Sequence, residues 1–164
     1  MNRYFEKISF EQFSNDICND RILYDNYELP IRKTKYSAGY DFIAIRNFVI
    51  KPGEIIKIPT GYKAKFLSDE VLMIVVRSSM GFKYNVRMCN QVGIIESDYY
   101  NNSSNDGHIW VALQNEGDKD FIIRKGDSYA QGIFTKFLTC GDNPLDERIG
   151  GFGSTNKERN DINE

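Results

Sequence analysis

Residues 40–66 read YDFIAIRNFVIKPGEIIKIPTGYKAKF, and this stretch decides the fold class. Its short apolar runs are separated by two turn sequences, one built on Pro52-Gly53 and the other on Pro59-Thr60-Gly61. Apolar runs this short, bounded by Pro and Gly, are typical of β-strands rather than helices. We therefore expect strands over the apolar runs beside these turns, at residues 40–45, 48–50, 55–58 and 62–66.

The same pattern continues toward the C-terminus. Apolar runs separated by Asn, Gly and Asp turns predict further strands at 71–76, 92–95, 109–113, 121–123 and 129–137. Many short strands at spacings of about ten residues favour an all-β sandwich or barrel.

One or two short helices accompany the strands. The sequence at 9–12 resembles a capping box and is followed by apolar residues at helical spacing, which predicts a helix near 10–18. A second, brief helix is expected over 79–86, with Ser78 or Ser79 as its N-cap.

Length, composition and charge fit one globular domain. The chain has 164 residues, of which 41% are hydrophobic and 27% charged. The longest purely apolar run, 71–76, is far shorter than the roughly 20 residues that span a bilayer, and no apolar stretch at the N-terminus marks a secretory signal. We therefore expect no membrane association. The net charge of −2 gives no basic excess, so we expect no nucleic-acid partner.

The cysteines and the single histidine indicate the redox compartment and argue against a zinc site. Cys18, Cys89 and Cys140 are odd in number and far apart, which is typical of a reducing compartment and predicts a cytoplasmic location. His108 has no partners at the spacing of a zinc motif. It follows Gly107 in a polar loop, so we expect it at the surface.

Two early segments place polar groups at strand ends. Residues 38–44 (AGYDFIA) set Asp41 in a strand, although an Asp there could simply bond a turn amide. Residues 77–83 (RSSMGFK) put a guanidinium, two hydroxyls and helix-start amides together, a set that suits phosphate oxygens. The structural alternative is a capped helix with a surface arginine.

Residues 90–100 (NQVGIIESDYY) form an apolar run that ends in two carboxylates and two aromatic rings. Carboxylates beside a stacked ring can activate a water molecule. The alternative is a polar hairpin tip with Tyr99 packed in the core.

Two later segments also contain candidate site residues. Gln131 lies inside the apolar run of GDSYAQGIF at 126–134, where a buried amide needs a partner. Residues 148–156 (RIGGFGSTN) frame Phe152 with glycines, so that its ring can stack on a base while neighbouring polar groups bind phosphate. A flexible linker is the alternative.

In this order and spacing, the five segments resemble the five motifs of the trimeric dUTPase family, over residues 29–156. The resemblance implies a homotrimer of β jelly-roll subunits with shared active sites that hydrolyse dUTP to dUMP and pyrophosphate with Mg²⁺. It divides the chain into an N-terminal extension with a short helix at 1–28, a barrel at 29–140 and a flexible Gly-rich lid at 141–164.

The resemblance also assigns the groups that hold the triphosphate. Arg77, Ser78 and Ser79 would hold phosphate oxygens, and Gln131 would do so too while placing the attacking water. Asp41 would reach Mg²⁺ through bound water, which suits an ion that keeps several of its waters.

The nucleoside and the lid are assigned in the same way. Tyr99 would lie under the deoxyribose and crowd out a ribose 2′-hydroxyl. The uracil edge would be read by Asn90 and by the backbone of Gly93, Ile94, Ile95 and Trp110. The lid would close through Arg148, Phe152, Ser154 and Thr155.

The sequence departs from the family pattern at several positions. Glu96 stands where the family has its general base, an Asp, and one extra methylene moves the carboxylate by about 1 Å, which can cost about 10²-fold in rate. The hairpin after Tyr99 is longer than usual, with residues 100–106 before Gly107. Ser128 replaces a usual Arg and Asn156 a usual Gly, which we regard as minor.

Two other functions are compatible with parts of this pattern. A dCTP deaminase, which shares the fold, resembles this pattern but needs an Arg at the position of Phe82 and a Glu at that of Ala112. A dUTPase-like regulator with weakened catalysis, acting through a protein partner as in some phage-related proteins, would suit Glu96 and the inserted residues 101–106. The intact Gln131 and the fifth segment favour the active enzyme.

Overall fold

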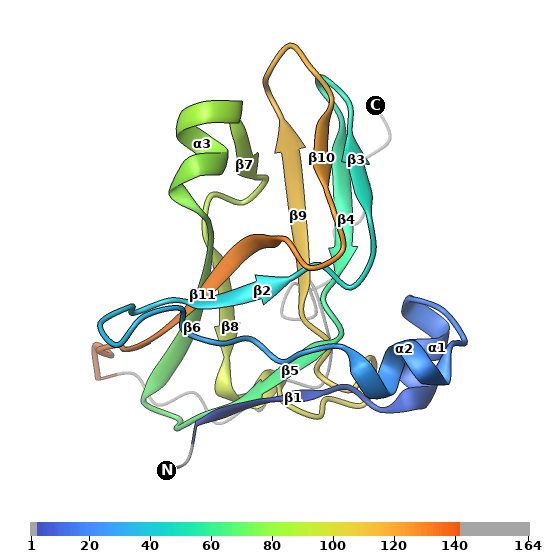
Figure 1. Cartoon of the computed structure of the whole chain (residues 1–164). Coiled ribbons are helices and arrows are strands. Elements are labelled where there is room, and N and C mark those ends of the chain that lie inside the picture. Colours follow the sequence, from blue (N-terminus) through green and yellow to red (C-terminus); the bar gives the residue numbers. More distant parts are fainter. Residues whose placement is uncertain (1–2, 142–164) are drawn as a thin grey trace, which may run out of the picture.

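The computed structural model describes residues 3–141, and strands dominate it (Figure 1). The strands are β1 (Tyr4–Lys7), β2 (Tyr40–Ile43), β3 (Phe48–Ile50), β4 (Ile55–Pro59), β5 (Tyr62–Lys65), β6 (Glu70–Val76), β7 (Val86–Met88), β8 (Gly93–Glu96), β9 (Trp110–Asn115), β10 (Phe121–Ile123) and β11 (Ser128–Lys136). The helices are α1 (Phe10–Asp16), α2 (Arg21–Asn26), α3 (Ser78–Tyr84) and the 3₁₀ turn η1 (Ser97–Tyr99). The expected all-β class is confirmed.

Antiparallel pairing joins these strands into small sheets that enclose one core. The largest sheet has the order β2-β11-β6-β8, the next β4-β9-β7, and β10-β3 and β1-β5 form pairs. Alternate residues of β6 point inward, so that Leu72 and Ile74 are buried while Val71, Met73 and Val75 face away from the core. The largest sheet therefore has one buried face and one accessible face, and the accessible face carries the site described below.

The N-terminal segment is built into the barrel. β1 pairs with β5 in register from Tyr4↔Lys65 to Lys7↔Tyr62. The expected first helix is present as α1, where Ser9 Oγ accepts a hydrogen bond from the Gln12 amide at 3.2 Å. β1 (YFEK), α2 (RILYDN) and β7 (VRM) were not predicted, because charged residues interrupt each of these short segments and leave no apolar run.

Two local predictions were wrong. α3 begins at Ser78 and its N-cap is Arg77, whose side chain makes no capping hydrogen bond, so neither serine caps the helix. His108 is fully buried rather than exposed, because its ring is enclosed between the Gly61 turn and α1.

Candidate active site

Asp41 and Gln131 lie side by side at the centre of the site. They are register partners on β2 and β11, so their side chains share the accessible face of the largest sheet. The Gln131 amide lies directly over Gly39, where an added Cβ would come within 2.3 Å of Oε1. Residue 39 must therefore be Gly for this Gln131 conformation to exist.

Arg77 joins this pair from the neighbouring strand. β6 pairs with β11 at Gln131↔Val75, and the chain leaves β6 just beyond this point. Arg77 Nε lies 3.9 Å from Asp41 Oδ1. Ser78 and Ser79 follow directly as the exposed first residues of α3. Arg77 of the second segment and Gln131 of the fourth thus meet beside Asp41 of the first, and Ser78 and Ser79 follow Arg77 in the chain.

The carboxylate of Asp41 is incompletely satisfied. It is 5% exposed, and its Oδ2 atom has no hydrogen-bond partner among the described residues. A buried carboxylate oxygen without a partner is costly unless a ligand completes it. A hydrated Mg²⁺ fits this position, because Mg²⁺ keeps most of its waters and uses few protein carboxylates. Residues 3–141 hold no cluster of three or more metal-ligating side chains, so further oxygens would come from a phosphate ligand.

A pocket of about 450 Å³ opens beside Arg77. Such a volume lies within the usual range for small-molecule sites. Its lining combines the second and fourth segments with β10, and includes Arg77, Ser79, Met80, Arg124, Ser128 and Tyr129. The Tyr129 hydroxyl is buried and has no hydrogen-bond partner within the described residues.

The third segment lies on β8, at the edge of the same sheet. Burial alternates along it, so Gly93 and Ile95 face inward while Ile94 and Glu96 are exposed. Asn90, just before β8, is also exposed. Since β8 is an edge strand, one side of its backbone is not used for pairing within the sheet and can meet a planar ligand edge.

Glu96 and Gln131 are far apart in one chain. Both flank β6, where Glu96 pairs with Val71 and Gln131 with Val75, so they share the accessible face. Along the strands they are four residues apart, which is about 13 Å, and across the sheet they are two strand spacings apart, which is about 10 Å. One water molecule cannot contact both side chains of the same chain.

Tyr99 lies in η1, directly after β8, and Trp110 begins β9. Tyr99 is 2% exposed, and its hydroxyl donates a hydrogen bond to the His108 carbonyl at 3.1 Å. Trp110 is half-buried at the start of β9, with its ring centroid 5.2 Å from that of His108. The Tyr99 ring is thus packed in the core, as in the structural alternative.

The dUTPase family profile matches residues 25–156. The chain belongs to the dUTPase family. It is 45% identical over 130 residues to the deoxyuridine 5′-triphosphate nucleotidohydrolase of Lactococcus lactis, covering 77% of this chain and 87% of that protein. The Streptococcus mutans dUTPase structure superposes with a TM-score of 0.69 at 34% identity, covering 84% and 98%. The dUTPase of phage phi11 of S. aureus shares the fold, with a TM-score of 0.66 at 17% identity, covering 90% and 98%.

Family membership confirms the jelly-roll expectation and weighs against the deaminase. Phe82 is 93% exposed on α3 and Ala112 is half-buried in β9, and neither side chain has a group that exchanges protons. The lid residues of this dUTPase homologue, Arg148, Phe152, Ser154 and Thr155, lie outside the described residues. No helix within residues 3–141 is long and apolar enough to cross a bilayer.

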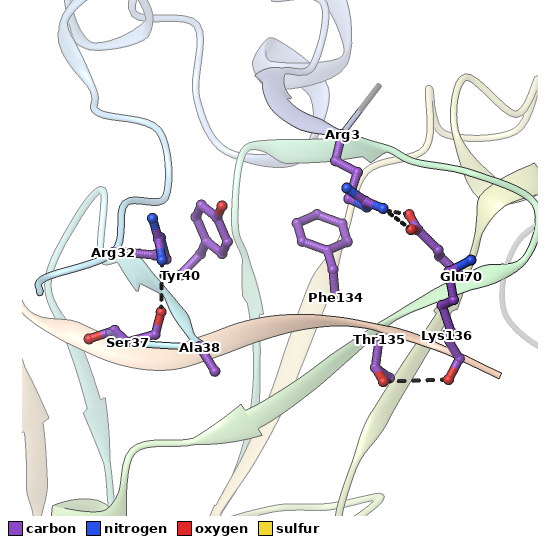
Figure 2. Close-up of a pocket in the computed structure, with 9 residues that line it drawn as sticks. All are labelled: Arg3, Arg32, Ser37, Ala38, Tyr40, Glu70, Phe134, Thr135 and Lys136. Atoms are coloured by element: carbon purple, nitrogen blue, oxygen red, sulfur yellow. Dashed lines mark hydrogen bonds and ion pairs between the residues drawn. The ribbon is translucent and has the colours of Figure 1, made fainter. Parts of the chain in front are cut away.

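A second pocket, of about 320 Å³, lies on the other face of the sheet (Figure 2). Tyr40 and Phe134 line it, and both alternate with the residues that face the site. Arg3 bonds Glu70 there, with Nε 2.6 Å from Oε2, and Arg32 donates to the carbonyl of Ser37 at 3.3 Å. Arg3 is thus paired with a buried carboxylate, and none of the groups that the resemblance assigns to the triphosphate lines this pocket.

Proposed function

We propose that this protein hydrolyses dUTP to dUMP and pyrophosphate. The observation that carries the proposal is the meeting of Asp41, Gln131 and Arg77 at one point of the largest sheet. A guanidinium, an amide and a carboxylate with an unsatisfied oxygen form a site for a triphosphate and its cation. The dUTPases similar to this chain cover most of its length, which supports the same substrate.

The triphosphate would be held by the cluster around Arg77. Arg77 offers charged donors, Ser78 and Ser79 offer hydroxyls, and the Gln131 amide can donate to a phosphate oxygen or orient water. Asp41 would hold Mg²⁺ through its coordinated waters. When bound, Mg²⁺ neutralises the charge that develops on the phosphate oxygens.

Glu96 would act as the general base. Its carboxylate would take a proton from water as the oxygen of that water bonds to phosphorus and the bond between dUMP and pyrophosphate breaks. Asp and Glu carry the same carboxylate group, so the replacement keeps the chemistry of the base. The longer side chain of Glu96 changes where the carboxylate lies rather than its charge.

The distance between Glu96 and Gln131 supports a site shared between copies. Between them on the accessible face lie Val71, Met73 and Ile94, an apolar strip of which Ile94 is 51% exposed. Packing this strip against other copies would bury apolar surface and bring Glu96 of one chain to Gln131 of another. The resemblance to trimeric dUTPases makes three copies the expected number, and the fifth segment would close each shared site.

The edge strand β8 would read the base. Backbone groups at Gly93–Ile95, together with Asn90, can pair with the donor and acceptor pattern of uracil. A site built on such hydrogen bonds rejects a ligand with the wrong pattern by roughly 10⁴–10⁵-fold. Tyr99 and the backbone at Trp110 would border the sugar and the base.

The free thiols of Cys18 and Cys89 support a reducing, cytoplasmic setting.

The test is pyrophosphate release from dUTP, dCTP, dTTP and UTP in the presence of Mg²⁺. We expect release from dUTP alone, and its loss in Glu96→Gln. Glu11→Gln is the matched control, since Glu11 is an exposed carboxylate on α1. Binding of dUTP without release from any nucleotide would contradict the enzymatic proposal and favour the regulatory alternative with a protein partner.

A further inference from the structure

His108 is a fully buried ring held at both nitrogens. Its Nε2 atom accepts a hydrogen bond from the Gly61 amide at 2.9 Å. Its Nδ1 atom lies 2.6 Å from Asp16 Oδ2, at the end of α1. Because an amide N–H can only donate, Nε2 carries the lone pair, so Nδ1 carries the proton and donates it to Asp16. The imidazole is therefore neutral and fixed in one tautomer.

The charged groups around this ring are both acidic. Asp16 faces it from α1, and Asp106 faces it from the inserted loop, and each favours the protonated ring. Burial outweighs them and lowers the pKa of His108 below its usual value. The lowered pKa of His108 agrees with the hydrogen bond from the Gly61 amide, because that bond needs an unprotonated Nε2.

The backbone of His108 connects this ring to Tyr99. The His108 carbonyl accepts a hydrogen bond from the Tyr99 hydroxyl at 3.1 Å and another from Asn105 Nδ2 at 3.3 Å. Asn105 Nδ2 also donates to the Tyr99 hydroxyl at 2.7 Å. Trp110 follows two residues later, with its ring against His108. Asp16 thus binds the ring of His108, and the backbone carbonyl of the same residue binds Tyr99.

The N-terminal segment also forms hydrogen bonds to the Gly61 turn and to the loop before His108. The Gly61 carbonyl accepts hydrogen bonds from the Tyr27 hydroxyl at 2.7 Å and the Ile8 amide at 3.1 Å. The Ser9 amide donates to Asp106 Oδ2 at 2.6 Å. The dUTPase profile begins at residue 25, so Asp16 belongs to a part of the chain outside the family match.

We propose that Asp16 is a positioning residue, which acts through His108 to fix Tyr99 and the start of β9 and thereby sets the preference for deoxyribose over ribose. This proposal rests on the proposed function, because it uses the nucleoside site assigned there. The room left for a 2′-hydroxyl depends on where the Tyr99 ring lies. A displacement of about 1 Å in a positioning group can change rate or binding by as much as about 10²-fold.

The experiment compares the wild type with Asp16→Ala, Asp16→Asn and Glu11→Ala. Asp16→Asn keeps an oxygen that accepts the His108 Nδ1 proton, whereas Asp16→Ala removes it. Glu11→Ala is the matched control on the same helix. For each protein, kcat and KM are measured for dUTP and UTP. Binding of dUMP and UMP is followed by the fluorescence of Trp110, the single tryptophan, and thermal unfolding shows that each variant is folded at the assay temperature.

We expect Asp16→Ala to lower the preference for dUMP over UMP by about tenfold, mainly through tighter UMP binding and a lower KM for UTP, because a displaced Tyr99 ring leaves room for the 2′-hydroxyl. Asp16→Asn and Glu11→Ala should keep the wild-type preference. An Asp16→Ala protein that melts at a lower temperature but keeps the full preference would show a merely structural role and overturn the proposal.

The binding measurement separates this proposal from the enzymatic one. A wild type that prefers dUMP but releases no pyrophosphate contradicts the catalytic proposal and leaves the Asp16 comparison decisive. A wild type that hydrolyses dUTP but binds dUMP and UMP equally overturns the positioning proposal alone.

Discussion

Gln131 on β11 pairs in register with Asp41 on β2, and its amide occupies the space that a side chain at residue 39 would need. Two strands that are about 90 residues apart in the sequence therefore place an amide beside a buried carboxylate. The position of Gln131 depends on the absence of a Cβ on its neighbour in the sheet.

Gly39→Ala should lower kcat strongly without unfolding the protein. The added Cβ would lie 2.3 Å from Gln131 Oε1 and 3.0 Å from its Cδ, so the flexible amide must move away. We expect a loss of about 10²-fold in pyrophosphate release, as for a displaced positioning group. Gly81→Ala is the control, since its Cβ would meet nothing within 4 Å. Equal activity in the two variants would contradict the role of Gln131.

Asp41→Asn should raise the Mg²⁺ concentration needed for half-maximal activity. The buried Asp41 Oδ2 has no partner within residues 3–141, and an amide binds the waters of a cation more weakly than a carboxylate does. Loss of such an outer contact typically costs about 10–100-fold in metal affinity or activity. A titration of activity against Mg²⁺ measures the shift, and an unchanged half-maximal concentration would refute the assignment.

Two inactive variants should restore each other when mixed. Glu96→Gln and Gln131→Ala each remove one side of a site that, in our proposal, is assembled from different chains. After co-refolding in equal amounts, random assembly leaves about a quarter of the sites with both residues intact. Pyrophosphate release should then return to about that fraction of the wild type.

Each variant refolded alone serves as the control for that mixture. If both residues served a site within one chain, mixing would restore nothing, and the shared-site proposal would fail.

Acid should weaken the fold through His108. Its pKa is lowered in the folded protein, mainly by burial, so the unfolded chain binds a proton more readily. The stability that this ring contributes is fully present above its unfolded pKa of about 6.5 and is lost as the pH falls through the lower folded value. The loss is at most about 1.4 kcal/mol per pH unit for one proton.

Urea unfolding between pH 8 and pH 5, followed by Trp110 fluorescence, measures this slope. His108→Gln carries no titrating ring, so its slope should be smaller in the same range. An equal slope in the two proteins would assign the acid sensitivity to other groups.

The sequence was informative wherever structure depends on near neighbours. Short apolar runs bounded by turn residues located most strands to within one or two residues, as for β3 at Phe48–Ile50 and β10 at Phe121–Ile123. The capping sequence at Ser9 predicted α1. The order of the five segments indicated the family, because each carries its chemistry within a few residues of chain.

Only the tertiary structure decided what lies next to what across the chain. His108 stands in a polar loop in the sequence, yet α1 covers it, because Asp16 and the Gly61 amide satisfy both ring nitrogens. Glu96 and Gln131 both mark the site in the sequence, yet strand register keeps them apart in one chain. Residue types and their local spacing thus determined the fold class and the chemistry. Strand register and burial, which arise from contacts between distant segments, decided how those groups are assembled.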